Sequence, residues 1–160
     1  MDLTTTLGLL GFLGACFLAA STGAFFKPGP WYESLAKPSW RPPNWLFPPA
    51  WAVLYILMAV AAWLVWREAG FSGAPLALTL WFAQLVLNAA WSWIFFGLKR
   101  MDLAFVELSA LWLAILATIL AFTLHSSTAA WLMAPYLAWV SFAGVLNLAM
   151  WRLNRGQVAA

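Results

Sequence analysis

Five long apolar runs constrain this sequence more than any other feature. They cover residues 3–26, 47–66, 76–98, 103–124 and 130–151. Each run approaches or exceeds the roughly 20 residues that a helix needs to cross about 30 Å of hydrocarbon. Only 8% of the residues are charged, whereas about a quarter is usual in a soluble domain. The sequence therefore predicts an all-α membrane protein, in which a bundle of five transmembrane helices forms a single domain over residues 1–160.

Polar and proline-rich breaks separate the five runs. The first loop, residues 27–46, contains five prolines and cannot be a continuous helix. The segment 67–70 is expected to end the second helix, and Asp102 is expected to cap the start of the fourth. Pro135 falls within the fifth run, so that helix either begins there or bends there.

The basic residues indicate how the bundle is oriented. One side of the predicted membrane carries those of the first loop, the third connection and the C-terminal segment: Lys27, Lys37, Arg41, Lys99, Arg100, Arg152 and Arg155. Only Arg67 lies on the other side. The positive-inside rule then predicts an N-terminus outside and a C-terminus in the cytoplasm. Eight basic residues are also too few for a nucleic-acid-binding face, so no nucleic-acid partner is expected.

Reactive side chains are few. The single Cys16 excludes an intramolecular disulfide and a multi-cysteine metal site. The segment before it carries Asp2 and no basic residue, so we expect the first run to be retained as a span rather than removed as a signal peptide. The single His125 lies in a predicted connection. No metal site, hydrolytic constellation or required cofactor is therefore expected.

Glu107 is the one acidic residue inside a predicted span. It lies about one turn into the fourth run, where its carboxylate is expected to reach the interface or to pair with Lys99 or Arg100. A proton-relay role is the alternative interpretation.

The first loop has two interpretations. Its tryptophans and basic residues are typical of an interfacial aromatic belt with cytoplasmic anchors. Alternatively, its prolines stiffen a lid that covers the end of the bundle, because proline lowers the entropy lost when a loop is ordered. In that case Lys37 and Arg41 are candidates to pair with carboxylates of a ligand.

Aromatic and amide side chains recur three and four residues apart, and therefore lie on one face of a helix. The third run carries Trp81, Gln84, Asn88, Trp91 and Phe95, the fifth Tyr136, Trp139, Ala143 and Asn147, and the second adds Trp51 and Tyr55. Amides are costly in hydrocarbon, so they should face the bundle interior. They either join helices by hydrogen bonds or orient a ligand in an aromatic pocket, and we expect both.

Three ordered blocks of sequence combine aromatic, proline and amide residues. The first contains Trp31-Tyr32, Lys37-Pro38, Trp40, Pro42-Pro43, Trp45, Phe47, Trp51, Leu54-Tyr55 and Met58; the second contains Gln84, Asn88, Trp91 and Phe95-Phe96-Gly97; the third contains Pro135-Tyr136, Trp139, Ala143, Leu146-Asn147 and Trp151-Arg152. Together they resemble the translocator protein/tryptophan-rich sensory protein family, and its bacterial branch above all. The blocks are in register with the spans and cover nearly the whole chain.

The resemblance implies a five-helix bundle, usually a homodimer, whose pocket opens under the first loop and binds porphyrins such as protoporphyrin IX. It also implies that Trp51 and Trp139 face one another across the ligand, beside Asn88 and Ala143. The full set of candidate ligand-binding residues is Trp40, Pro42, Phe47, Trp51, Tyr55, Gln84, Asn88, Trp91, Tyr136, Trp139, Ala143 and Asn147.

These implications lead to one function with alternatives. We expect a sensor or carrier that binds a tetrapyrrole and regulates its level or transport. A light- and oxygen-dependent porphyrin-degrading enzyme, with Trp51 and Trp139 as candidate catalytic residues, is the alternative from another class. A transporter is a third, and a purely structural or partner-binding membrane protein is a fourth. Family members also bind cholesterol, but residues 146–152 lack the tyrosine of the family's sterol-recognition stretch, so sterol binding by that route is doubtful. A bacterial inner membrane is favoured over an outer one.

Overall fold

The computed structural model describes residues 2–156, and helices are the only regular secondary structure in this part of the chain. They are α1 (Leu3–Phe25), α2 (Pro30–Ser34), α3 (Phe47–Gly73), α4 (Pro75–Ser92), α5 (Met101–Thr123) and α6 (Ser127–Leu153). A 3-10 turn (Asn44–Leu46) precedes α3, and a π-helical turn (Trp93–Gly97) extends α4. Every long helix is long and apolar enough to cross a membrane. The prediction of an all-α membrane bundle is confirmed.

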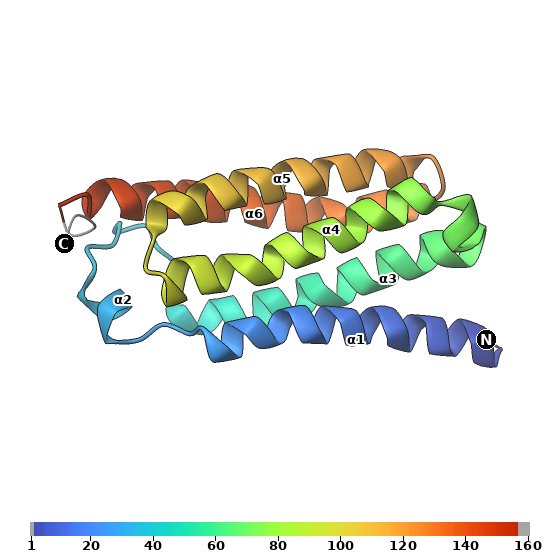
Figure 1. Cartoon of the computed structure of the whole chain (residues 1–160), viewed down its shortest axis with the longest axis horizontal. Helices are drawn as coiled ribbons and strands as arrows, with labels where there is room; N and C mark the ends of the chain where they lie inside the picture. Colours follow the sequence, from blue (N-terminus) through green and yellow to red (C-terminus); the bar gives the residue numbers. More distant parts are fainter. Residues whose placement is uncertain (1, 157–160) are drawn as a thin grey trace.

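The five long helices form a closed bundle. Helix α1 packs against α3 and α4, α3 against α6, α6 against α5, and α5 against α4. Figure 1 shows them side by side along one common direction. Small residues allow close approach at the centre, where Ala59, Ala61 and Ala62 of α3 have no exposed surface. This packing buries aromatic, amide and methionine side chains together inside the bundle.

The connections divide between the two ends of the bundle. Helix α2, the α4–α5 connection and the C-terminal end of α6 lie at one end, whereas the N-terminus and the other two connections lie at the opposite end (Figure 1). The basic residues of the first loop, the third connection and the C-terminal segment therefore gather at one end, as the sequence predicted. Arg67 belongs to the other end, where its guanidinium lies 4.6 Å from the ring centroid of Trp63.

The regular part of the second span ends where the sequence predicted. Helix α3 reaches Gly73, but it is kinked at Gly70, whose φ of 66° and ψ of −178° are not helical, so the prediction that the segment 67–70 ends the span is confirmed. Pro75 then begins α4 at its first position, where its missing N–H breaks no intrahelical hydrogen bond. The kink at Gly70 thus ends the regular part of α3, and Pro75 begins the next helix.

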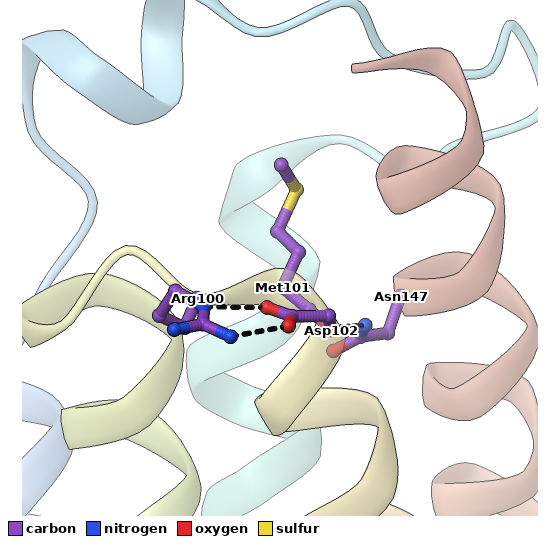
Figure 2. A network of polar contacts seen from close by, with 4 residues as sticks. All are labelled: Arg100, Met101, Asp102 and Asn147. Atoms are coloured by element: carbon purple, nitrogen blue, oxygen red, sulfur yellow. Dashed lines mark hydrogen bonds and ion pairs between the residues drawn. The ribbon is translucent and has the colours of Figure 1, made fainter. Parts of the chain in front are cut away.

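Two further boundary predictions are resolved. Asp102 was expected to cap α5, which is wrong: Arg100 is the N-cap, and Asp102 lies in the first turn, paired with the Arg100 guanidinium through contacts of 2.6 and 2.8 Å (Figure 2). This pairing raises the pKa of Arg100 above its ordinary value, through hydrogen bonds and then charge. Pro135 lies inside α6, which begins at Ser127, so the alternative start at the proline is also wrong.

Candidate ligand-binding cavity

A cavity of about 520 Å³ lies inside the bundle beneath the first loop. All five long helices contribute to its wall, and Phe26, Pro28, Tyr32 and Asn44 close it from the loop side. Eight of the sequence-predicted residues line it: Phe47, Trp51, Tyr55, Asn88, Trp91, Trp139, Ala143 and Asn147. Its size lies within the range of small-molecule sites, about 300–1,000 Å³.

Aromatic rings form much of the cavity wall. The Trp51 and Trp139 ring centroids are 6.4 Å apart, with an interplanar angle of 84°. Phe47 packs edge to face on Trp139, and Tyr55 lies tilted against Trp51. The two indoles therefore meet edge to face in this structure, rather than as parallel faces on either side of a ligand.

A hydrogen-bonded chain joins three helices at the floor of the cavity. The Tyr55 hydroxyl donates to Asn88 Oδ1, and Asn88 Nδ2 donates to the Tyr136 hydroxyl oxygen at 2.7 Å. Tyr136 is fully buried and does not line the cavity. Asn88 thus joins α3, α4 and α6 by hydrogen bonds, as one interpretation predicted, and it also lines the cavity, where its role in orienting a ligand stays a prediction.

Gln84 lies deeper than predicted, outside the cavity lining. It has no exposed surface, and its amide nitrogen lies 3.8 Å from the sulfur of Met58. Trp81 occupies the same layer and donates from its indole nitrogen to the Met58 carbonyl at 3.2 Å. One helical turn separates Gln84 from Asn88, and that turn places the first amide in the packed core.

The two cations of the loop are engaged within the loop itself. Lys37 Nζ donates to the carbonyls of Glu33 and Leu35, at 3.0 and 3.1 Å. Arg41 Nη1 donates to the Tyr32 hydroxyl oxygen at 3.1 Å and to Asn44 Oδ1 at 2.8 Å. Neither cation lines the cavity, and the pairing of Lys37 and Arg41 with carboxylates of a ligand stays a prediction. Arg41 does position two residues that line the cavity, Tyr32 and Asn44.

The remaining predicted loop residues also lie away from the cavity. Trp40 is 48% exposed and packs on Phe142 of α6, with ring centroids 6.0 Å apart. Pro42 is likewise absent from the lining. Sequence reasoning instead missed Pro28, Tyr32 and Asn44 as lining residues. The aromatic character of the loop pointed to Tyr32, but nothing in the sequence distinguished its inner from its outer face.

Sequence reasoning also missed the residue that fastens the loop to the bundle. The side chain of Asn154, at the end of α6, accepts from the Ala36 backbone N–H at 2.9 Å and donates to the Ala36 carbonyl at 2.9 Å. It also donates to the Met150 carbonyl at 2.7 Å, and Asn154 is only 1% exposed. The loop is therefore held as a lid, which we define as residues 27–46.

Polar groups without a partner occur beside the cavity and deeper in the bundle. Among the described residues, Trp91 Nε1, Asn147 Oδ1, Gln84 Oε1 and both carboxylate oxygens of Glu107 are buried without a hydrogen-bond partner. The expected pairing of Glu107 with Arg100 or Lys99 is wrong, because the one ion pair in the described part of the chain joins Arg100 to Asp102. No group of three metal-ligating side chains occurs among these residues, and no charged residue lines the cavity.

Comparison with known proteins identifies relatives over almost the whole chain. The sequence model of the TspO/MBR family matches residues 12–152. The chain is 46% identical to protein CrtK of Rhodobacter capsulatus, over 89% of this chain and 90% of the relative. It is 45% identical to a tryptophan-rich sensory protein of Cereibacter sphaeroides, over 91% and 90%. It is 42% identical to the human translocator protein, over 92% and 90%.

Proposed function

This integral, multi-pass membrane protein belongs to the TspO/MBR family, and we propose that it binds tetrapyrroles of the protoporphyrin IX type in the cavity beneath the lid. The observation that carries the proposal is the cavity itself: about 520 Å³, walled by tryptophan, tyrosine and phenylalanine rings, and without a charged lining residue. Such a wall favours a flat apolar ring, because aromatic contacts add to the free energy of burying apolar surface.

The proposed pose keeps the charged end of the ligand at the lid. Propionates are costly to bury without a counter-ion, and the cavity offers none. Lys37 and Arg41 are the cations of the lid, and each would exchange a hydrogen bond within the loop for one to a ligand carboxylate. Binding would then regulate the level or the movement of the tetrapyrrole by holding it inside the bundle.

Titration of protoporphyrin IX into purified protein, followed by tryptophan fluorescence quenching, tests the proposal. The double variant Trp51→Phe with Trp139→Phe should bind at least about 10-fold more weakly, because two wall indoles are each replaced by a smaller ring. Trp131→Phe is the matched control, since Trp131 is 77% exposed near the start of α6, away from the lid. Unchanged affinity in the double variant would remove the basis for this pocket assignment.

A second candidate function is light- and oxygen-dependent breakdown of the bound porphyrin. The contact that favours it is the 6.4 Å approach of the Trp51 and Trp139 rings in the cavity wall, which would make both indoles candidate electron donors to an excited ligand. Illumination of the complex in air, with the porphyrin spectrum followed, separates the candidates. If no new pigment depends on the protein, the protein binds porphyrin without degrading it.

The proposal also includes the orientation of the protein in the membrane, its oligomeric state and other ligands. The basic residues at the lid end support a cytoplasmic lid and C-terminus with an N-terminus outside, in a bacterial inner membrane. We also propose a homodimer, and sterol as a weaker ligand class because residues 146–152 lack the tyrosine of the recognition stretch. A transport function would require porphyrin to accumulate in proteoliposomes in a protein-dependent way.

A further inference from the structure

A second hollow lies on the outer flank of the bundle, between α3 and α6. It is a groove lined by apolar residues alone: Ala50, Val53, Leu54, Pro135, Ala138, Trp139 and Phe142. Val53 is 56% exposed, and Pro135 and Ala138 are exposed as well, so the groove opens to the surroundings of the helices. Because both helices are long and apolar enough to cross a membrane, the groove faces the hydrocarbon of the bilayer.

Trp139 is the one residue in the described part of the chain that lines both this groove and the internal cavity. On the cavity side its ring packs against Phe47 and Trp51, with ring centroids 5.8 and 6.4 Å away. On the groove side it packs against Phe142, with ring centroids 5.8 Å apart. The Trp139 indole is therefore part of the wall between the cavity and the bilayer.

Ring contacts, and no hydrogen bond of its nitrogen, hold the Trp139 indole in place among the described residues. Other indoles of the bundle are fixed more firmly. Those of Trp63 and Trp81 each donate to a backbone carbonyl, and that of Trp112 donates to a serine hydroxyl. Rotation of Trp139 thus breaks no hydrogen bond of the indole and leaves no buried donor unpaired.

The lid reaches the same wall through Phe142. Trp40 of the lid packs on Phe142 with ring centroids 6.0 Å apart, and Phe142 in turn packs on Trp139. A closed lid therefore holds Phe142 against Trp139. When the lid opens, Phe142 loses this contact, and the ring beside Trp139 gains room to move.

The chemistry of a tetrapyrrole with carboxylates favours a sideways route. Passage through the lid would expose the whole apolar ring to water, which the hydrophobic effect opposes. Passage between α3 and α6 keeps the ring among apolar groups. The groove begins at Ala50, about one turn into α3 from the lid end, so the carboxylates can stay at the membrane interface while the ring moves.

We propose that Trp139 is a side gate, whose indole turns to let the tetrapyrrole pass between the cavity and the bilayer along the groove between α3 and α6. The closed lid holds this gate shut through Trp40 and Phe142. The proposal rests on the tetrapyrrole function above and names the route by which the ligand enters and leaves. The lid thereby controls the exit without being the exit.

The test fills the groove without changing the lining of the cavity. Ala138→Phe adds a ring beside Trp139, at a residue that lines the groove and not the cavity. For the full chain in detergent, association and release of protoporphyrin IX are followed by tryptophan fluorescence. Both should slow at least about 5-fold, because crowding raises the barrier to rotation of the indole. The dissociation constant is the ratio of the two rate constants, and should change less than about 2-fold.

Val145→Phe is the matched control for an added ring on α6. Val145 is 60% exposed and lines neither the groove nor the cavity, so neither rate should change. Should Ala138→Phe fail to fold, Ala50→Phe decides, because Ala50 lies on the α3 wall of the same groove.

A double variant separates the side route from a route through the lid. Asn154→Ala loosens the lid, and adding Ala138→Phe should slow release from that variant at least about 5-fold if the ligand leaves through the groove. If the added ring leaves the release rate of Asn154→Ala unchanged, the ligand leaves through the lid and the side gate is overturned.

Two other results would also overturn the side gate while the tetrapyrrole function stands. In the first, Ala138→Phe changes neither rate. In the second, it weakens binding by speeding release alone, which would mean that the added ring distorts the cavity. If the wild type does not bind protoporphyrin IX at all, the proposed function itself fails, and the route for this ligand fails with it.

Discussion

Replacing Asn154 with alanine removes the side chain that joins the lid to the end of α6. Two hydrogen bonds to the backbone of Ala36 are lost, each 2.9 Å long. A hydrogen bond contributes about 0.5–1.5 kcal/mol net. Ala36 is exposed, so water can replace part of this loss. The closed lid should therefore be destabilised by about 1–2 kcal/mol, which raises the open population about 5- to 30-fold.

Ligand dissociation measures this change most directly. If the lid must open before protoporphyrin IX leaves, its dissociation rate from Asn154→Ala should rise by about the same 5- to 30-fold. Hydrogen exchange of the backbone amides in residues 27–46 should rise in parallel, while exchange in the middle of α3 stays unchanged.

Ser34→Ala provides the matched control within the same lid. Its hydroxyl donates only to the Trp31 carbonyl, at 2.7 Å and at an exposed position, so it joins nothing to the bundle. The rate at which protoporphyrin IX dissociates from the Ser34→Ala variant should stay within about 2-fold of the wild-type rate. The reasoning is refuted if Asn154→Ala exchanges its lid amides faster but releases the ligand at the wild-type rate, because the lid would then not control the exit.

Three further predictions concern the packing of the bundle, each checked by thermal unfolding in detergent. Glu107→Leu should stabilise the protein by about 1 kcal/mol or more, since both carboxylate oxygens are buried without a partner; a lower unfolding temperature would contradict this. Gly8→Ala should destabilise it by about 1–3 kcal/mol, because a Cβ there would lie 2.2 Å from the Trp66 ring; an unchanged midpoint would show that the indole moves freely. Tyr136→Phe should cost about 1–3 kcal/mol by leaving the Asn88 amide nitrogen unpaired, whereas a neutral effect would mean that water replaces the hydroxyl.

The spans and their arrangement into a helical bundle were predictable because they depend on local properties. Hydropathy over about 20 residues decides whether a segment crosses the bilayer, and the proline-rich stretch after Phe26 had to interrupt the helices. The helix ends were less predictable. Asp102 was expected to be a cap but forms an ion pair with Arg100 instead, because the choice between those two partners depends on how the chain reverses at residues 98–100.

The candidate site was predictable as a face and not as a cavity. Spacing by three and four residues put Gln84, Asn88 and Trp91 on one side of α4, yet the cavity ends between Gln84 and Asn88. How far the cavity extends along a helix depends on the side chains that the neighbouring helices insert at each level. The residues on the inner surface of the lid could not be predicted for the same reason. Tyr32 lines the cavity, whereas Trp40 packs outside it.

The sequence by itself determined that this protein lies in a membrane, which segments cross it, and at which end of the bundle the cations gather. Each of these properties follows from the composition of a single segment. The tertiary structure decided which polar atoms are paired. It set the Trp51 and Trp139 indoles edge to face, fastened the lid to Asn154, and left Asn147 Oδ1 buried without a hydrogen-bond partner. Those outcomes depend on the rotation and depth of each helix against its neighbours, which only the packed bundle specifies.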